Sequence, residues 1–130
     1  MLTDDELGLW FHAGLTTDFT LYTTSRANPA GPWDPPQPIP ELDDGHSYSD
    51  PQLANERVLV FSAERPDGVG ALDIWMATRA DAASPFGPPI NLTEVNSTSD
   101  DSSPWLSADE KTLYFTSERS GDRAIYRATR

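Results

Sequence analysis

The amino-acid sequence predicts an all-β fold made of tandem repeats, and three observations lead to this prediction. Residues 106–130 match residues 2–26 without a gap after a shift of 104 positions, and residues 58–79 form a third copy with a longer loop. Each copy contains two short runs of aromatic and branched residues around a polar or glycine-containing loop, as in an antiparallel β-hairpin. No segment keeps the 3.6-residue period of an amphipathic helix.

The expected hairpins are followed, in the first two copies, by proline-rich connections. The paired runs are Leu9–Phe11 with Leu21-Tyr22, Val58–Phe61 with Ile74-Trp75, and Leu113–Phe115 with Ile125-Tyr126, and their tips are Leu15–Asp18, Pro66–Gly70 and Ser120–Asp122. The proline-rich connections are residues 30–42 and 84–95, in which Trp33 matches Phe86. Because proline lacks the N–H donor that a central strand needs, a strand in either connection should be an edge strand.

Four short strands in 50-odd residues, with a proline-rich outer strand, are typical of a propeller blade. We therefore predict one domain, residues 1–130, that is a partial β-propeller of four-stranded antiparallel blades. Blade 1 (incomplete) is expected at residues 1–49, blade 2 at 50–100 and blade 3 (incomplete) at 101–130. The middle strands should be apolar on both faces, because neighbouring blades cover both.

The motifs of the second and third copies resemble the repeat of the TolB-like, WD-repeat-like β-propeller family. The third copy has Asp101, Pro104, the Ser107–Glu110 turn and Arg119, and the middle copy has Asp50-Pro51. The motifs drift between the copies, which indicates that these positions maintain the fold and do not form a repeated ligand site. The positions are Asp50, Pro51, Phe61, Ser62, Arg65, Asp73, Ile74, Trp75, Asp101, Pro104, Ser107, Asp109, Phe115, Ser117, Arg119 and Tyr126. The strand order of the family implies that the first blade lacks its innermost strand and the last its outermost.

The number of repeats raises the question of what covers the two ends of the array. Propellers close with about four to eight blades, whereas this sequence holds about two and a half. A six-bladed ring would be completed either by a longer chain or by a homo-oligomer of two copies. The resemblance implies a periplasmic or extracellular protein, but the acidic N-terminus, MLTDDELG, does not read as a signal peptide.

Composition excludes several classes of partner. The formal net charge is −12 and the isoelectric point is about 4.2, so we expect no binding to nucleic acid or to anionic lipid surfaces. No apolar run approaches the roughly 18 residues of a membrane span, so we expect no membrane insertion. The absence of cysteine excludes disulfides and thiolate chemistry.

The sequence predicts no catalytic residue and no cofactor. The candidate calcium ligands are Asn96, Asp100 and Asp101; the alternative is that the acidic residues here hydrogen-bond turn amides. An ion pair between Arg65 and Asp73 could lock the middle hairpin, and the third copy offers Arg119 with Asp122 instead.

Two tryptophans, Trp33 and Trp105, are candidates for a binding surface, because tryptophan stacks well on sugars and peptides. By contrast, Trp10 and Trp75 are expected in the core. Taken together, these features predict a non-catalytic interaction or scaffold module that binds a protein, peptide or glycan. The alternative is a propeller fragment of a larger hydrolase, a peptidase or glycosidase, whose catalytic residues lie outside this stretch.

Overall fold

The computed structural model describes residues 1–15 and 18–130, which form an all-β fold. The strands are β1 (Gly8–Leu15), β2 (Asp18–Ser25), β3 (Gln37–Pro38), β4 (Ser47–Ala54), β5 (Val58–Glu64), β6 (Asp73–Thr78), β7 (Ile90–Asn91), β8 (Asp101–Leu106), β9 (Thr112–Ser117) and β10 (Ala124–Thr129). A single 3-10 turn, Pro40–Leu42, is the only helical element in the described part of the chain, and no helix there is long and apolar enough to cross a membrane.

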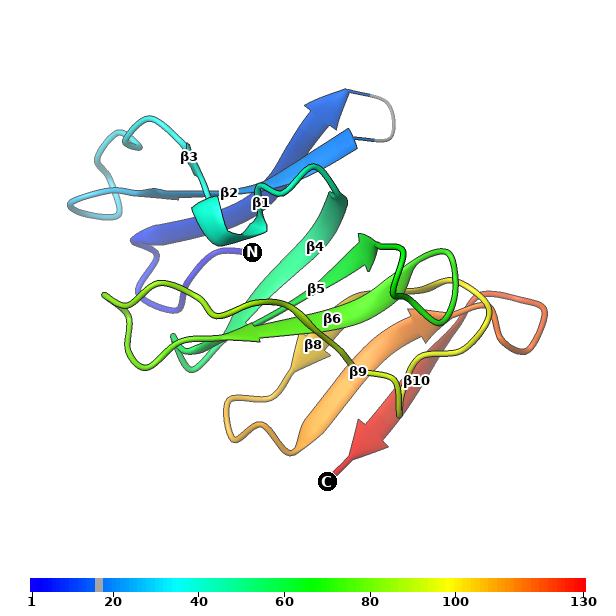
Figure 1. Cartoon of the computed structure of the whole chain (residues 1–130). Coiled ribbons are helices and arrows are strands. Elements are labelled where there is room, and N and C mark those ends of the chain that lie inside the picture. The colour runs from blue at the N-terminus through cyan, green and yellow to red at the C-terminus, as the bar shows by residue number, and fades with distance from the viewer. Residues whose placement is uncertain (16–17) are drawn as a thin grey trace.

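The strands form three antiparallel sheets in chain order (Figure 1). Sheet A has the order β1-β2-β3, sheet B the order β4-β5-β6-β7, and sheet C the order β8-β9-β10. The three expected hairpins are confirmed as β1–β2, β5–β6 and β9–β10. Strands β3 and β7 lie in the two proline-rich connections and are edge strands, as expected for segments in which proline removes N–H donors. The tip of the first hairpin includes residues 16 and 17, which lie outside the described residues.

Sheet B is the only sheet with four strands in the described ranges 1–15 and 18–130. Among the described residues, sheet A has no full strand at the position of β4, although Leu2 forms an isolated bridge with Leu9 there. The same part of the chain places no strand on sheet C at the position of β7. The innermost strand β4 starts at Ser47, before the boundary that we expected at residue 50.

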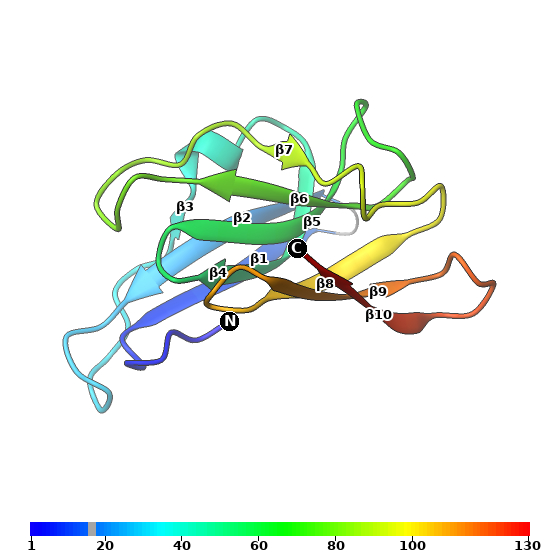
Figure 2. The same cartoon turned by 90° about the horizontal axis from the view of Figure 1, so that it is seen from below.

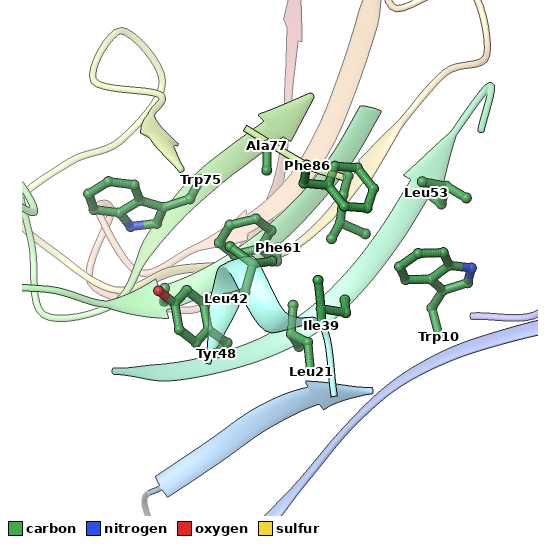
Figure 3. Close-up of a cluster of buried hydrophobic side chains, with 12 residues drawn as sticks. Trp10, Leu21, Ile39, Leu42, Tyr48, Leu53, Phe61, Trp75, Ala77 and Phe86 are labelled. Atoms are coloured by element: carbon green, nitrogen blue, oxygen red, sulfur yellow. The ribbon is translucent and has the colours of Figure 1, made fainter. Parts of the chain in front are cut away.

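The three sheets stack face to face, with sheet B in the middle (Figures 1 and 2). The layer between sheets A and B contains Trp10, Leu21, Phe61, Trp75 and Phe86 (Figure 3). A second layer, between sheets B and C, contains side chains such as those of Val60, Ile74, Leu113 and Phe115. Strand β5 alternates between the two layers, and all its residues except the last are buried. The prediction that the middle strands are apolar on both faces is therefore confirmed for sheet B.

Candidate functional site

The same turn precedes the hairpins of sheets A and C. In the first turn, Thr3 Oγ1 donates to Asp5 Oδ1 at 2.7 Å and accepts from the backbone N–H five residues later at 2.7 Å. In the second turn, Ser107 Oγ donates to Asp109 Oδ1 at 2.6 Å and accepts from the N–H five residues later at 3.0 Å. These hydroxyl donors are the main cause of the lowered pKa of each aspartate. The two turns are 104 positions apart, the shift that relates the two sequence segments.

The turn before β5 lacks these side-chain bonds among the described residues but shares one feature with the other two: all three contain a glutamate in the left-handed region, with φ of 59° at Glu6, 62° at Glu56 and 59° at Glu110. The arginine that ends each sequence copy donates a hydrogen bond to this glutamate. The acceptor is the backbone carbonyl oxygen of the glutamate in the first two copies and its carboxylate in the third. The pairs are Arg26–Glu6, Arg79–Glu56 and Arg130–Glu110, at 2.8, 2.7 and 2.8 Å. The recurrent arginines therefore fasten the last strand of each hairpin to the turn before it.

A buried ion pair connects the first strand of sheet C to its hairpin. Arg119 Nη2 lies 2.7 Å from Asp101 Oδ1, and the Asp101 side chain is fully buried. The second carboxylate oxygen accepts from Ser97 N at 2.6 Å and Ser97 Oγ at 2.9 Å. Burial by itself raises the pKa of Asp101, but hydrogen bonds from Ser117, Arg119 and Ser97 outweigh it and lower the pKa. The expected pairing of Arg119 with Asp122 is wrong, because the arginine turns inward to the buried carboxylate.

Arg65 occupies the corresponding position in sheet B and also departs from its expected partner. Its guanidinium donates to the Tyr48 hydroxyl and to Asp44 Oδ2, the latter at 2.8 Å. The Tyr48 hydroxyl in turn donates to Asp44 Oδ1 at 2.7 Å. Asp73, the partner predicted from the sequence, instead accepts from the backbone N–H groups of Val69 and Gly70 in the hairpin tip. The predicted Arg65–Asp73 lock is wrong, and a cluster of Arg65, Tyr48 and Asp44 takes its place.

The Tyr48 hydroxyl bridges this cluster. Burial, and then its hydrogen bond to Asp44, raise the pKa of Tyr48 well above the ordinary value of a phenol. Burial also opposes the ionisation of Asp44, but hydrogen bonds from Arg65 and Tyr48 hold its pKa below the ordinary value. The hydroxyl therefore stays protonated and donates to a carboxylate that stays ionised.

Replacing Tyr48 with phenylalanine should lower the free energy of unfolding by about 2 kcal/mol, because the hydroxyl makes two hydrogen bonds with charged groups, one to the Asp44 carboxylate and one from the Arg65 guanidinium. Urea denaturation followed by tryptophan fluorescence would measure the change. Tyr22→Phe is the matched control, because the Tyr22 ring stacks on Phe11 at 5.7 Å on the outer face of sheet A; we expect a change below about 0.5 kcal/mol. Equal losses in the two variants would contradict the role of the Tyr48 hydroxyl.

The β-bulges in β4 and β8 fix which residues of sheets B and C correspond. Each bulge holds a residue with positive φ, Asp50 (51°) and Ser103 (53°), directly before a proline. Tyr48 and Asp101 then share one register position, opposite Ala63 and Ser117. The sequence comparison placed Asp50 with Asp101 because both are aspartates, whereas aligning the prolines would have found Tyr48.

The bulges also connect neighbouring sheets. The backbone N–H of Asp50 donates to His12 Nδ1 of sheet A at 3.2 Å, and that of Ser103 donates to Ser62 Oγ of sheet B at 3.1 Å. His12 and Ser62 occupy the same place on β1 and β5, opposite Leu21 and Ile74. One bulge N–H thus anchors each sheet to the previous one, which gives His12 a structural contact that sequence reasoning missed.

Two of the three candidate calcium ligands, Asn96 and Asp101, already accept hydrogen bonds from protein donors through their side-chain oxygens. Asn96 Oδ1 accepts from Ile74 N at 2.9 Å, and Asn96 Nδ2 donates to Asn91 Oδ1 at 2.8 Å. Both oxygens of Asp101 are engaged as described above, and Asp100 contributes its backbone carbonyl to Glu118 N at 3.1 Å. In residues 1–15 and 18–130, no group of three or more histidine, cysteine or acidic side chains is placed to hold a metal ion.

The four tryptophans divide as the sequence suggested. Trp10 and Trp75 are buried at 7% and 1% exposure, whereas Trp33 and Trp105 are 36% and 49% exposed. Trp33 lies under the Arg26 guanidinium, 4.3 Å from ring centroid to Cζ, and Trp105 lies beside Tyr114 with ring centroids 6.0 Å apart. The two exposed rings are on different sheets, A and C, and so do not form one surface.

A groove of about 370 Å³ opens between sheets B and C, at the outer edge of the stack. Its walls come mainly from β5 and the chain after β7 on one side and from β9 and β10 on the other; they are mostly apolar, with charged residues such as Glu94 and Lys111 also in the lining. Among its lining residues are Val60, Leu92, Val95, Leu113, Ala128 and Arg130. No protein-family model matches this chain, and no curated protein matches it.

Proposed function

We propose that this chain is a segment of a β-propeller that works as a non-catalytic interaction module for a protein or peptide partner. The observation that carries the proposal is the serial stacking of three antiparallel sheets, in which a bulge N–H of sheet B bonds to sheet A and the equivalent bulge N–H of sheet C bonds to sheet B. Such contacts give every sheet one face for the sheet before it and one for the sheet after it. The radial order β4-β5-β6-β7 of sheet B is that of a propeller blade.

The two end faces support this reading, because they carry apolar side chains with no described sheet against them. On sheet C, Trp105, Tyr114 and Ile125 are 49%, 40% and 76% exposed. On sheet A, Phe11 and Tyr22 stack on the face opposite Trp10. Exposed apolar surface of this kind marks an interaction site. The place of Trp105 among apolar side chains favours a protein partner over a glycan.

The two faces are also complementary by position. Tyr114 and Ile125 correspond to Val60 and Ile74, which pack on sheet C from sheet B. On the other end, Phe11 corresponds to Phe61, which packs on sheet A from sheet B. The free faces therefore carry the two halves of the contact that already joins the sheets. Sheet C of one copy should pack on sheet A of another, with two copies supplying six sheets.

We expect concentration-dependent self-association, with a limiting mass of about 29 kDa, twice the 14.3 kDa of the chain. Size-exclusion chromatography with light scattering over a concentration series would measure it. Ile125→Lys should weaken the association at least about tenfold, because it places an unpaired charge in the interface. Val69→Lys, at an exposed hairpin tip, is the control and should leave the association unchanged. A chain that is monomeric at every concentration, or equal behaviour of the two variants, would contradict this use of the end faces.

A further inference from the structure

We propose that the outer edge of β10 and the groove beside it bind an extended peptide of defined sequence pattern. The pattern is proline, an aromatic residue, glycine or aspartate, two prolines, any two residues, and then isoleucine or leucine. This inference rests on the proposed function, since it names a partner for the interaction module. It comes from comparing the outer edges of the three sheets. Sheets A and B each hold such a segment at this edge, and sheet C holds none within the described residues.

The two segments that are present share sequence and backbone contacts. Residues 32–39 read PWDPPQPI, and residues 85–92 read PFGPPINL. In both, the residue after the aromatic donates its N–H to the last residue of the neighbouring strand, and the residue five positions later donates to the residue four positions earlier on that strand. The bonds are Asp34 N to Ser25 O (2.8 Å), Ile39 N to Leu21 O (3.0 Å), Gly87 N to Thr78 O (2.8 Å) and Leu92 N to Ile74 O (3.1 Å).

The aromatic residue of the segment anchors it between two sheets. Phe86 is 6% exposed in the layer between sheets A and B, with its ring edge-on to Trp10 at 6.0 Å (Figure 3). The Arg79 guanidinium lies over the Phe86 ring at 4.6 Å. Trp33 has the same relation to Arg26, at 4.3 Å. An aromatic ring under the arginine that closes the hairpin is therefore common to both segments.

The groove between sheets B and C corresponds, residue by residue, to the Phe86 site. The registers of the strands make Val60 the counterpart of Trp10, Leu113 of Leu59, and Ala128 of Ala77. The same comparison makes Leu92 the counterpart of Ile39, and Arg130 that of Arg79. All of these residues line the groove, whereas their apolar counterparts belong to one buried cluster with Phe86, and Trp10 and Arg79 contact its ring. The groove is thus a Phe86 site without its phenylalanine.

The neighbouring strand offers the matching backbone acceptors. Thr129 pairs with Thr112 as Thr78 pairs with Val58, so its carbonyl faces the open edge in the same way. Ile125 pairs with Thr116 as Ile74 pairs with Ser62, which makes its carbonyl the second acceptor. A peptide that adds a strand here gains these main-chain hydrogen bonds, and its prolines reduce the conformational entropy lost on binding.

The test uses the full chain and a fluorescein-labelled peptide of residues 80–95, ADAASPFGPPINLTEV, followed by fluorescence anisotropy. We expect saturable binding that weakens at least tenfold when the phenylalanine of the peptide is replaced by alanine. The protein variant Ala128→Phe fills the groove and should abolish binding. Ala124→Phe, on the same strand but outside the groove, should leave it unchanged. Far-UV circular dichroism and chemical-shift changes at Leu113 and Arg130 confirm that the fold persists and locate the peptide.

Three results would overturn the proposal: no saturable binding, equal binding of the alanine peptide, or full binding by Ala128→Phe. If Ala128→Phe instead lowers the mass of the chain in solution without peptide, a second copy occupies the groove and the proposal falls. Light scattering on the same samples separates this failure from that of the proposed function. Self-association through the end faces with no peptide binding would overturn only the proposal that the groove binds a peptide, and would leave the proposed function standing.

Discussion

Replacing Asp101 with asparagine is expected to lower the free energy of unfolding by about 3 kcal/mol, as for the loss of one partner of a buried ion pair. The substitution keeps the size of the side chain but leaves the Arg119 guanidinium without its carboxylate at 2.7 Å. It also weakens the acceptor for Ser97 N and Ser97 Oγ. Because the Arg119 side chain is 31% exposed, water compensates part of the loss, which places the expected value at the lower end of the range for buried pairs. Urea denaturation at neutral pH measures it.

The control for Asp101 is Asp122→Asn, at the exposed tip of the same hairpin. If Arg119 paired with Asp122, as its sequence spacing suggested, this variant would be the more damaging one. We expect a change below about 0.5 kcal/mol, as for most exposed sites. A larger loss for Asp122→Asn than for Asp101→Asn would contradict the ion pair of the structure.

The lowered pKa of Asp101 also fixes the sign of a pH effect. A carboxyl whose pKa is lower in the folded state than in the unfolded state stabilises the fold above its unfolded pKa. That contribution decreases as the pH falls through the folded pKa. The stability of the wild-type chain should therefore decline more steeply than that of Asp101→Asn below about pH 5. Parallel curves would show that Asp101 does not contribute.

Replacing Phe86 with alanine should cost about 3–5 kcal/mol, because it leaves a cavity between sheets A and B. The ring is lost from the layer that contains Trp10 and Leu21, and Arg79 loses the aromatic face beneath it. Thermal and urea denaturation measure the loss. The variant creates between sheets A and B a groove like the one that is already present between sheets B and C.

Trp33→Ala is the matched comparison, because Trp33 has the equivalent position in the first proline-rich segment and the equivalent arginine, Arg26, above its ring. Its ring is 36% exposed, so the expected cost is only about 1 kcal/mol, most of it from the cation–π contact. Equal losses at Phe86 and Trp33 would show that the inner packing of Phe86 contributes little.

The sequence predicted the features that depend on local signals. Alternating aromatic and branched residues located the three hairpins, and the prolines at 38 and 89 correctly placed β3 and β7 at the sheet edges. Burial of both faces of β5 followed from its continuous run of apolar residues. In each case, the strand period or the missing N–H of proline decides the outcome without knowledge of distant contacts.

The partners of the charged residues could not be predicted in this way. Arg65 reaches Asp44, which lies before β4 and outside the hairpin that carries the arginine. Each bulge adds one residue to an innermost strand. Because of this extra residue, aligning β4 with β8 by residue type gives a different result from aligning them by strand register. Tyr48 therefore replaces the aspartate that the comparison with Asp101 led us to expect. In sheet B the Tyr48 hydroxyl and the Asp44 carboxylate together bind Arg65, whereas in sheet C the Asp101 carboxylate binds Arg119.

The serial order of the sheets has a consequence for how the molecule opens. Packing contacts join sheet A to sheet B and sheet B to sheet C, so the array is a line of nearest neighbours. A terminal sheet can detach by breaking one layer, whereas the central sheet must break two. Fraying thus begins at the ends, and a substitution in one layer reaches the other only through the strands of sheet B. A further sheet docked at either end would turn a fraying sheet into an interior one and leave the existing contacts as they are.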